Sequence, residues 1–320
     1  MADTLARPPV AFERILAKRA LLSALGPLAG LRAEGTVTAT AIGGDVVLPP
    51  FTYAGLRFLI ATTLLWAVAW WRSRPLPRRQ DVPLLIFTGV LSFAVNYGLV
   101  FWGQRQIASG LAAVLQAMIP AFAMFFAHYW LPGEPFTKRK LAGVAIGLCG
   151  TGMIFYNQLT LAGSAAVSGS LAVLTSTITA SLSSVLVKKH FQHLAPEVLA
   201  ASQTSCGVLP LLLAGVLVEG NPLTIHWTAS AVGSLLYLAL VGSACAFLLF
   251  YWLVQQMEVT KVMLISLVTP VLALFLGNLT LHEQINWRLA VGSAAIIAGV
   301  GLILVQRGST PRLQKAHGHD

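Results

Sequence analysis

Residues 118–134 read MIPAFAMFFAHYWLPGE, and residues 268–283 read VTPVLALFLGNLTLHE. Each stretch contains a proline, then an apolar run, then a closing glutamate. The two prolines, Pro120 and Pro270, lie 150 residues apart, and the two glutamates lie 149 residues apart. This recurrence predicts that the chain contains two copies of one apolar unit.

The composition indicates that this unit is embedded in lipid. Of the 320 residues, 56% are hydrophobic and only 10% are charged, whereas a soluble domain carries about 25% charged residues. So few charges cannot cover the surface of a soluble domain. The net charge of +10 comes from short basic clusters between apolar runs, which is typical of membrane topology and not of a nucleic-acid-binding surface. The sequence therefore predicts a protein of the lipid bilayer that binds no nucleic acid.

Nine segments are apolar over roughly the 20 residues that a helix needs to cross the hydrocarbon core. They are residues 51–71, 84–103, 107–131, 141–156, 169–187, 198–218, 229–254, 262–281 and 289–305. Residues 20–47 form a doubtful tenth span, because Arg32 and Glu34 follow a short apolar run. Both charges at the bilayer centre would cost about 5–7 kcal/mol if unpaired. The local pattern therefore argues against a crossing here.

The distribution of basic residues argues for that crossing. Ten spans with a cytoplasmic N-terminus place seventeen basic residues on the cytoplasmic side and only Arg105 and Arg288 outside. Such an asymmetry is what the positive-inside rule expects. We therefore predict about ten transmembrane helices in the inner membrane, the first of them atypical. Residues 1–19 and 306–320 are then cytoplasmic tails.

The two copies are predicted to be five-helix repeats at residues 20–157 and 169–305. The offset of 149 to 150 residues continues through three consecutive helices, where it pairs Trp102 with Trp252, Arg139 with Arg288, Gly143 with Gly292 and Gly150 with Gly299. Because five is odd, the second repeat enters the membrane from the opposite side. Such inverted repeats are typical of transporters, which bind substrate near the midplane between the halves.

The paired proline, glutamate and glycine pattern resembles that of a known family. Together with PPFTYAGLRF at residues 49–58 and the glycine-rich helices at residues 141–152 and 289–301, it is similar to the EamA type of the drug/metabolite transporter superfamily. The resemblance implies an all-α transporter that moves a small organic metabolite, typically exporting an amino acid or a derivative, by alternating access. It also implies a central cavity lined mainly by spans 1, 3, 4, 6, 8 and 9. Residues 20–47 depart from the family pattern, which usually opens with a clean apolar helix.

Polar residues inside the predicted spans are the candidates for substrate binding, since polar side chains are costly against lipid. They are Asn96, Gln116, Ser176 and Ser266. Asn96 pairs with Ala246 in the second copy, so its polarity is specific to one half and favours contact with a ligand. For Gln116, an interhelical hydrogen bond is an equal alternative to a place in the cavity. Serine hydroxyls can also bond back to their own helix.

Other residues carry two interpretations each. Pro120 and Pro270 each remove a backbone hydrogen bond, which indicates either a hinge or a fixed kink. Glu134 and Glu283 either couple transport to protons or form helix-end hydrogen bonds. Arg57 lies inside a span and either stabilises the structure or binds substrate.

The small-residue faces of the fifth and tenth spans are read as scaffold, or as the surface of a homodimer. The three cysteines, far apart in sequence, and the two histidines of the C-terminal tail predict no metal site. The sequence contains no Walker motif, HExxH motif or serine–histidine–aspartate grouping at a shared depth. We therefore expect no enzyme activity and no cofactor. A membrane sensor or partner-binding protein without flux is the alternative to a transporter.

Overall fold

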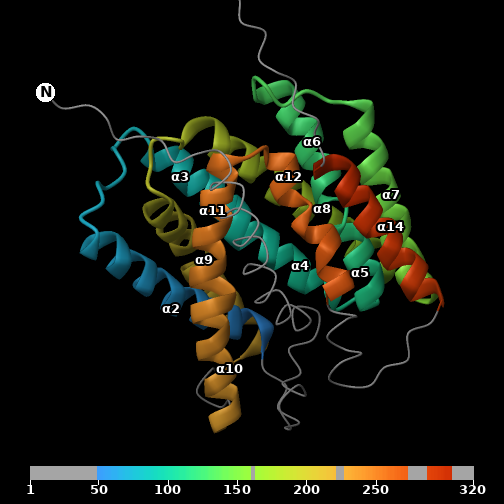
Figure 1. Cartoon of the computed structure of the whole chain (residues 1–320). Helices are drawn as coiled ribbons and strands as arrows, with labels where there is room; N and C mark the ends of the chain where they lie inside the picture. The colour runs from blue at the N-terminus through green and yellow to red at the C-terminus, as the bar shows by residue number, and fades with distance from the viewer. Residues whose placement is uncertain (1–48, 160–162, 221–226, 273–286, 305–320) are drawn as a thin grey trace, which may run out of the picture.

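The computed structural model describes residues 49–159, 163–220, 227–272 and 287–304, and every regular element within these ranges is helical (Figure 1). The α-helices are α2 (Pro50–Trp71), α3 (Val82–Gly89), α4 (Asn96–Gln104), α5 (Ser109–Gln116), α6 (Ile119–Trp130), α7 (Lys138–Ile154), α8 (Gly163–His190), α9 (Pro196–Glu219), α10 (Ala229–Ala239), α11 (Ala246–Gln256), α12 (Val259–Met263) and α14 (Trp287–Leu304). Two π-helices, η3 (Val90–Val95) and η6 (Leu240–Cys245), and a 3₁₀-helix, η4 (Tyr156–Gln158), join them.

Seven helical segments in the described ranges are long and apolar enough to cross a membrane. Two further predicted spans are represented by shorter helices, since α7 has 17 residues and the apolar helix at Val259–Leu272 is also short. The prediction of an all-α, multi-pass membrane protein is confirmed. The doubtful span at residues 20–47 lies outside the described residues.

Local sequence signals explain where these helices begin. Proline occupies the first turn of α2, α3, α6 and α9, a position where its missing N–H removes no hydrogen bond from the helix that it begins. Helix α7 instead begins after Thr137, whose hydroxyl accepts a hydrogen bond from the Lys140 backbone N–H at 3.2 Å. Such a cap satisfies one of the unpaired N–H groups of the first turn.

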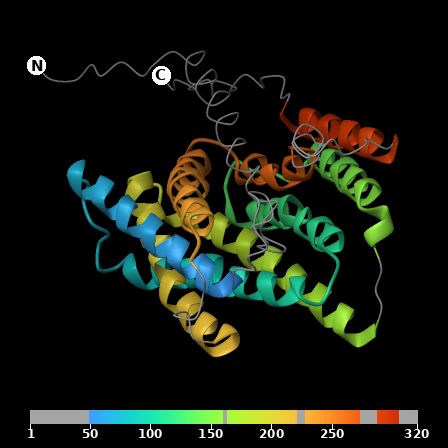
Figure 2. The same cartoon turned by 90° about the horizontal axis from the view of Figure 1, so that it is seen from below.

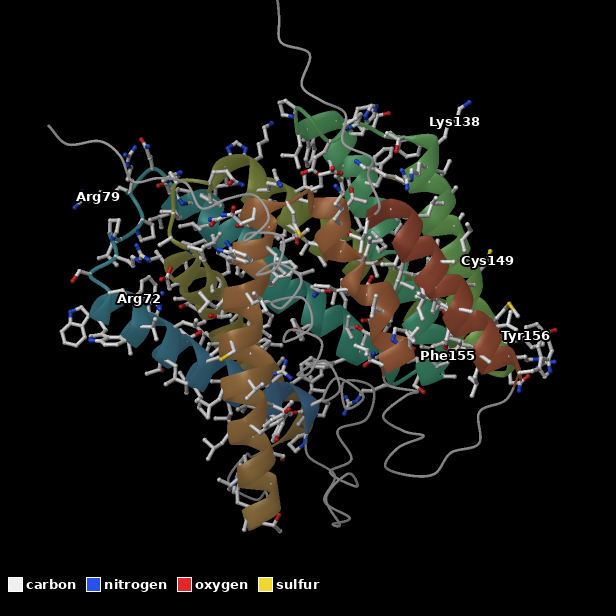
Figure 3. All side chains as sticks on the ribbon, in the orientation of Figure 1. Arg72, Arg79, Lys138, Cys149, Phe155 and Tyr156 are labelled. Atoms are coloured by element: carbon white, nitrogen blue, oxygen red, sulfur yellow. The ribbon has the colours of Figure 1, made fainter. Side chains whose placement is uncertain are left out.

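Consecutive spans run in opposite directions, so the connections divide between two faces of the molecule. We call one the basic face; it carries residues 72–81, 131–137, 191–195 and 257–258. The opposite face carries residues 105–108, 155–159 and the start of α2. Arg79 and Lys138 lie toward the basic face, whereas Phe155 and Tyr156 lie toward the opposite face (Figure 3). Several polar contacts between distant segments join residues of the same face, such as Arg72 with Glu197 and Phe51 with Glu219, and these hold the spans side by side.

Helices α7 and α14 pack through glycine along one edge of the molecule (Figure 2). A Cβ added at Gly150 would lie 2.6 Å from the Gly292 carbonyl oxygen, and one added at Gly299 would lie 2.5 Å from the Gly143 carbonyl oxygen. Only glycine allows two backbones to approach so closely. The predicted small-residue faces therefore contact each other within one chain, and a homodimer through them stays a prediction.

Two spans contain π-helical turns at matching positions. The first, η3, begins at Val90, and the second, η6, begins at Leu240. These starts differ by 150 residues, the offset that pairs Pro120 with Pro270. A π-turn widens the helix and is often found at functional sites.

Candidate functional site

The fourth span is interrupted near its middle. Helix α5 ends at Gln116, α6 begins at Ile119, and Pro120 lies in the first turn of α6. Proline has no N–H to donate, so the Gln116 carbonyl lacks its helical donor. The Ile119 carbonyl accepts a hydrogen bond from the Ser181 hydroxyl of α8 at 2.9 Å. The break therefore presents backbone carbonyls within the membrane depth, where they must face protein or a solute.

The second copy differs in detail. Helix α12 ends at Met263 and Leu264 forms the turn, six residues before Pro270. Pro270 itself lies in the helical residues that follow. In the first copy the span is therefore interrupted beside its proline, whereas in the second copy the interruption lies away from the proline. A hinge at either proline stays a prediction.

A chain of hydrogen bonds crosses the bundle beside η3. The Gln203 side-chain amide donates to the Thr88 hydroxyl at 2.8 Å, and the Ser183 hydroxyl donates to the Thr88 carbonyl at 2.8 Å. The Ser92 hydroxyl in turn donates to Ser183 at 2.7 Å. Thr88, Ser183 and Gln203 are completely buried. This network ties α3, η3, α8 and α9 together through neutral polar groups.

The sequence reading missed Thr88 and Gln203 as members of this network. Thr88 and Ser92 lie four residues apart and so share one helix face, which is a signal that the sequence contains. Gln203 is a polar residue inside the predicted span at residues 198–218, so this signal was also present in the sequence. The missing information was that the two spans are neighbours.

The four predicted substrate-binding residues lie apart. Asn96 begins α4 directly after η3, and Gln116 is the last residue of α5; both are partly buried. Ser176 is buried and donates to the Val173 carbonyl at 2.6 Å, while Ser266 donates to the carbonyl three residues earlier at 2.9 Å. Two of the hydroxyls thus bond to their own helices. Within the described ranges no hydrogen bond joins any two of the four.

Arg57 lies in a cluster of aromatic rings. Its side chain is buried, and its guanidinium carbon lies 4.9 Å from the Phe58 ring centre and 6.0 Å from that of Tyr97. Phe93 and Phe247 pack against Phe58 with centroid distances of 5.3 Å and 5.8 Å. Ring faces attract a cation, more strongly where water is excluded. This geometry stabilises a positive charge inside the protein.

Glu134 makes a helix-end contact at the basic face. Its carboxylate accepts the backbone N–H of Val259, the first residue of α12, at 2.9 Å and 3.1 Å. It also pairs with Lys188 of α8 at 3.1 Å. The carboxylate thus satisfies an N–H group at the start of α12, where the helix dipole also favours negative charge. Glu283 lies outside the described residues.

Further charges surround this contact and were not recognised from the sequence. Lys140 pairs with Glu258 at 2.8 Å, and Glu258 also pairs with Lys261 at 2.8 Å. Burial raises the pKa of Glu258, but hydrogen bonds from the two lysines outweigh this effect and hold the pKa below its usual value. We call Glu134, Lys140, Lys188, Glu258 and Lys261 the charged cluster. Acidic residues directly after span ends are the signal that the sequence offered for it.

Glu219 plays a comparable part at the opposite face. Its carboxylate accepts the backbone N–H of Phe51 at 2.7 Å and that of Thr52 at 2.8 Å, and the Thr52 hydroxyl at 2.9 Å. The end of α9 therefore caps the start of α2. At the other end of this helix pair, Glu197 accepts a hydrogen bond from Arg72 at 2.8 Å.

The arrangement suits binding and movement of a solute. It offers backbone carbonyls at a helix break, hydroxyl and amide groups in the spans, and a buried cation among rings. Among the described residues, no group of three or more His, Cys, Asp or Glu side chains is placed to hold a metal ion.

Known proteins resemble this chain over most of its length. It is 28% identical over 254 residues to the uncharacterized transporter YoaV of Bacillus subtilis, covering 79% of this chain and 86% of that protein. It is 30% identical over 231 residues to the uncharacterized inner membrane transporter YedA of Escherichia coli K12, covering 72% and 73%. It is 28% identical over 268 residues to a probable terminal-alkyne amino-acid exporter of Streptantibioticus cattleyicolor, covering 81% and 86%. A crystal structure with 20% identity superimposes with a TM-score of 0.74 over 90% of this chain and 96% of the other, which shows the fold.

The EamA-like transporter family model matches the chain twice, at residues 33–156 and 167–305. The first match begins before Pro49, so part of the stretch that departs from the family pattern by inspection still aligns with the family. Together the matches cover most of the chain, and the seven apolar helices of the described ranges indicate a multi-pass membrane protein. The chain belongs to the EamA-like transporter family.

Proposed function

We propose that this protein exports a small organic metabolite, such as an amino acid or a derivative, by alternating access of two inverted five-helix repeats. The observation that carries the proposal is the pair of π-helices, η3 and η6, at a separation of 150 residues. Irregular helices at corresponding positions in two halves are typical of transporters whose site lies between those halves. Equivalent irregular turns allow the halves to exchange conformations at similar energy.

The solute binds near the midplane, between the break in the fourth span and the π-turn of the third. Asn96 lies at the end of that π-turn and Gln116 at the break. Both are partly buried and uncharged, so they can hydrogen-bond a polar solute without first releasing an ion pair. Ser176 and Ser266 contribute to binding mainly through their own helices. Each hydroxyl either donates to a backbone carbonyl of its helix or leaves that carbonyl free to accept another hydrogen bond.

Two relatives support the substrate class. One is named a probable terminal-alkyne amino-acid exporter, and another, from Salmonella typhimurium, is named a probable amino-acid metabolite efflux pump. Each is only 27% or 28% identical to this chain, so the class and not the compound is proposed. A sensor that kept the transporter scaffold is the second candidate, and it would bind solute without moving it.

The test is a resistance screen followed by flux measurements. Cells that overproduce the protein are challenged with toxic amino-acid analogues, and any hit is followed as uptake into inside-out vesicles. Asn96→Leu and Gln116→Leu should lower flux at least about tenfold at unchanged membrane abundance. Gln80→Leu, in an exposed loop of the basic face, is the matched control. Binding without flux would favour the sensor, and normal flux in both variants would overturn the proposed site.

The proposed orientation has its own test. Reporter fusions after Arg79, Lys140 and Lys189 should read as cytoplasmic, and fusions near Ala165 and Asn221 as external. A cytoplasmic signal at Ala165 would contradict the inverted repeat.

A further inference from the structure

The charged cluster joins segments that are far apart in the sequence. Glu134 and Lys140 belong to the first segment that the family model matches, whereas Lys188, Glu258 and Lys261 belong to the second. The Glu134–Lys188 pair, the Glu134–Val259 hydrogen bonds and the Lys140–Glu258 pair all cross between the two segments. Any separation of the two segments at the basic face would break each of these contacts.

Water is largely excluded from this junction. The side chains of Glu134 and Lys140 are each 5% exposed, and those of Lys188 and Glu258 are 18% and 20% exposed. Lys140 also donates to the Pro135 carbonyl at 3.0 Å, and Lys188 donates to the Met257 carbonyl. The charges are therefore held by several partners each, in a setting where losing one partner is costly.

Among the residues that the structure describes, no lysine–glutamate pair lies at the opposite face. The offsets between the two copies place Leu289 opposite Lys140, Ala108 opposite Glu258 and Leu111 opposite Lys261. Three charged members of the cluster thus have apolar counterparts. If the two halves exchange conformations, the counterpart residues cannot form the ion pairs that Glu258 makes with Lys140 and Lys261.

We propose that the charged cluster is an ionic latch that closes the solute path at the basic face and must open in every transport cycle. The inference rests on the proposed alternating access. Because the counterparts of Lys140, Glu258 and Lys261 are apolar, these ion pairs favour the state that is closed at the basic face, which is then the resting state. Its strength therefore sets how often the path opens toward the basic face.

The latch can be tested by cysteine labelling without any solute. Cys149, Cys206 and Cys245 are first replaced by alanine. Thr260→Cys then reports on the basic face, because Thr260 is completely buried beside Val259. Ser168→Cys reports on the opposite face, where the Ser168 hydroxyl contacts Gln106 at 3.1 Å.

Lys140→Met should raise the labelling rate of Thr260→Cys by an impermeant maleimide about tenfold and lower that of Ser168→Cys, because opening one face closes the other. Lys138→Met is the matched control, an exposed lysine in the same helix turn that should change neither rate. Lys140→Arg should restore protection. If Lys140→Met does not insert into the membrane, Lys188→Met replaces it, and the same two labelling rates are measured.

Unchanged labelling of Thr260→Cys, or faster labelling at both faces, would overturn the latch, since the second result indicates general loosening. If labelling becomes faster at Thr260→Cys and slower at Ser168→Cys but no metabolite is transported, the result would support the latch and refute the transport proposal. Flux with no opposed shift would support transport and refute the latch.

Discussion

The basic face and the opposite face hold the same helices together by different means. At the basic face, ion pairs join Lys140 to Glu258, Lys188 to Glu134 and Arg72 to Glu197. At the opposite face, Glu219 accepts backbone N–H groups and Arg288 donates to the Asn157 side chain at 3.0 Å. One face depends on pairs of charges and the other on hydrogen bonds to neutral partners. The basic face should therefore respond to pH and to loss of charge, and the opposite face mainly to loss of an acceptor.

The largest expected effect is at Glu134. Glu134→Ala leaves the partly buried Lys188 ammonium without this carboxylate and the Val259 N–H of α12 without its acceptor, so it should lower the free energy of unfolding by about 3–5 kcal/mol. Denaturant titration of the detergent-solubilised protein measures this loss. Glu134→Gln keeps an acceptor for the Val259 N–H but not the charge, and should recover less than half of it. A loss below about 1 kcal/mol for Glu134→Ala would remove the contrast between the faces.

Glu219→Ala should cost less, about 1–3 kcal/mol, because it leaves the Phe51 and Thr52 N–H groups without their acceptor. Here Glu219→Gln should recover most of the loss, since a neutral oxygen can accept the same hydrogen bonds. The same denaturant titration compares the Gln and Ala variants at positions 134 and 219. The difference between them separates the contribution of the negative charge from that of the hydrogen-bond acceptor. Equal recovery at both positions would show that the faces do not differ.

Acidification should weaken the basic face selectively. The pKa of Glu258 is held below its usual value by Lys140 and Lys261, so its contribution is present above the ordinary carboxyl pKa of about 4.3 and is lost as pH falls through the lower pKa of the folded state. Glu134 and Lys188 complete the charges near this site. The loss should be about 1 kcal/mol. Thermal unfolding from pH 7 to pH 3.5, compared between the native chain and Glu258→Gln, measures it, and parallel curves would contradict it.

The smallest expected effects are at the ends of the α7–α14 pair. Arg139 donates to the Leu302 carbonyl at 2.6 Å at the basic face, and Arg288 donates to Asn157 and lies 5.0 Å from the Tyr156 ring at the opposite face. Both arginines contact neutral partners at exposed positions, so alanine at either should cost about 0.5–1 kcal/mol. Similar losses in thermal unfolding would show that this pair is alike at both ends. A clearly larger loss of stability for Arg139→Ala than for Arg288→Ala would show that the α7–α14 pair also depends on charge at the basic face.

Much of the fold was visible in the sequence, and less of the site. The pairing of Gly143 with Gly292 and of Arg139 with Arg288 came from a constant offset. The structure places Gly143 and Arg139 against α14 and Gly292 against α7, whereas Arg288 contacts Asn157 of η4, just after α7. The four predicted substrate-binding residues all lie in helical segments but make no hydrogen bonds with one another in the described ranges. Their position along a span can be predicted from the sequence, whereas their neighbours depend on how the spans pack. Their part in binding stays a prediction.

The sequence by itself determined that this protein is an all-α, multi-pass membrane protein, because hydropathy over about 20 residues and the scarcity of charge are local properties. It also pointed to two copies, because an offset can be counted along the chain. Only the tertiary structure decided that Glu134 meets Val259, that Glu219 caps α2, and that the ion pairs gather at one face. Glu134 and Val259 lie 125 residues apart, and Glu219 and Phe51 lie 168 residues apart. A carboxylate that can pair with any cation or N–H group takes the one that packing brings within hydrogen-bonding distance.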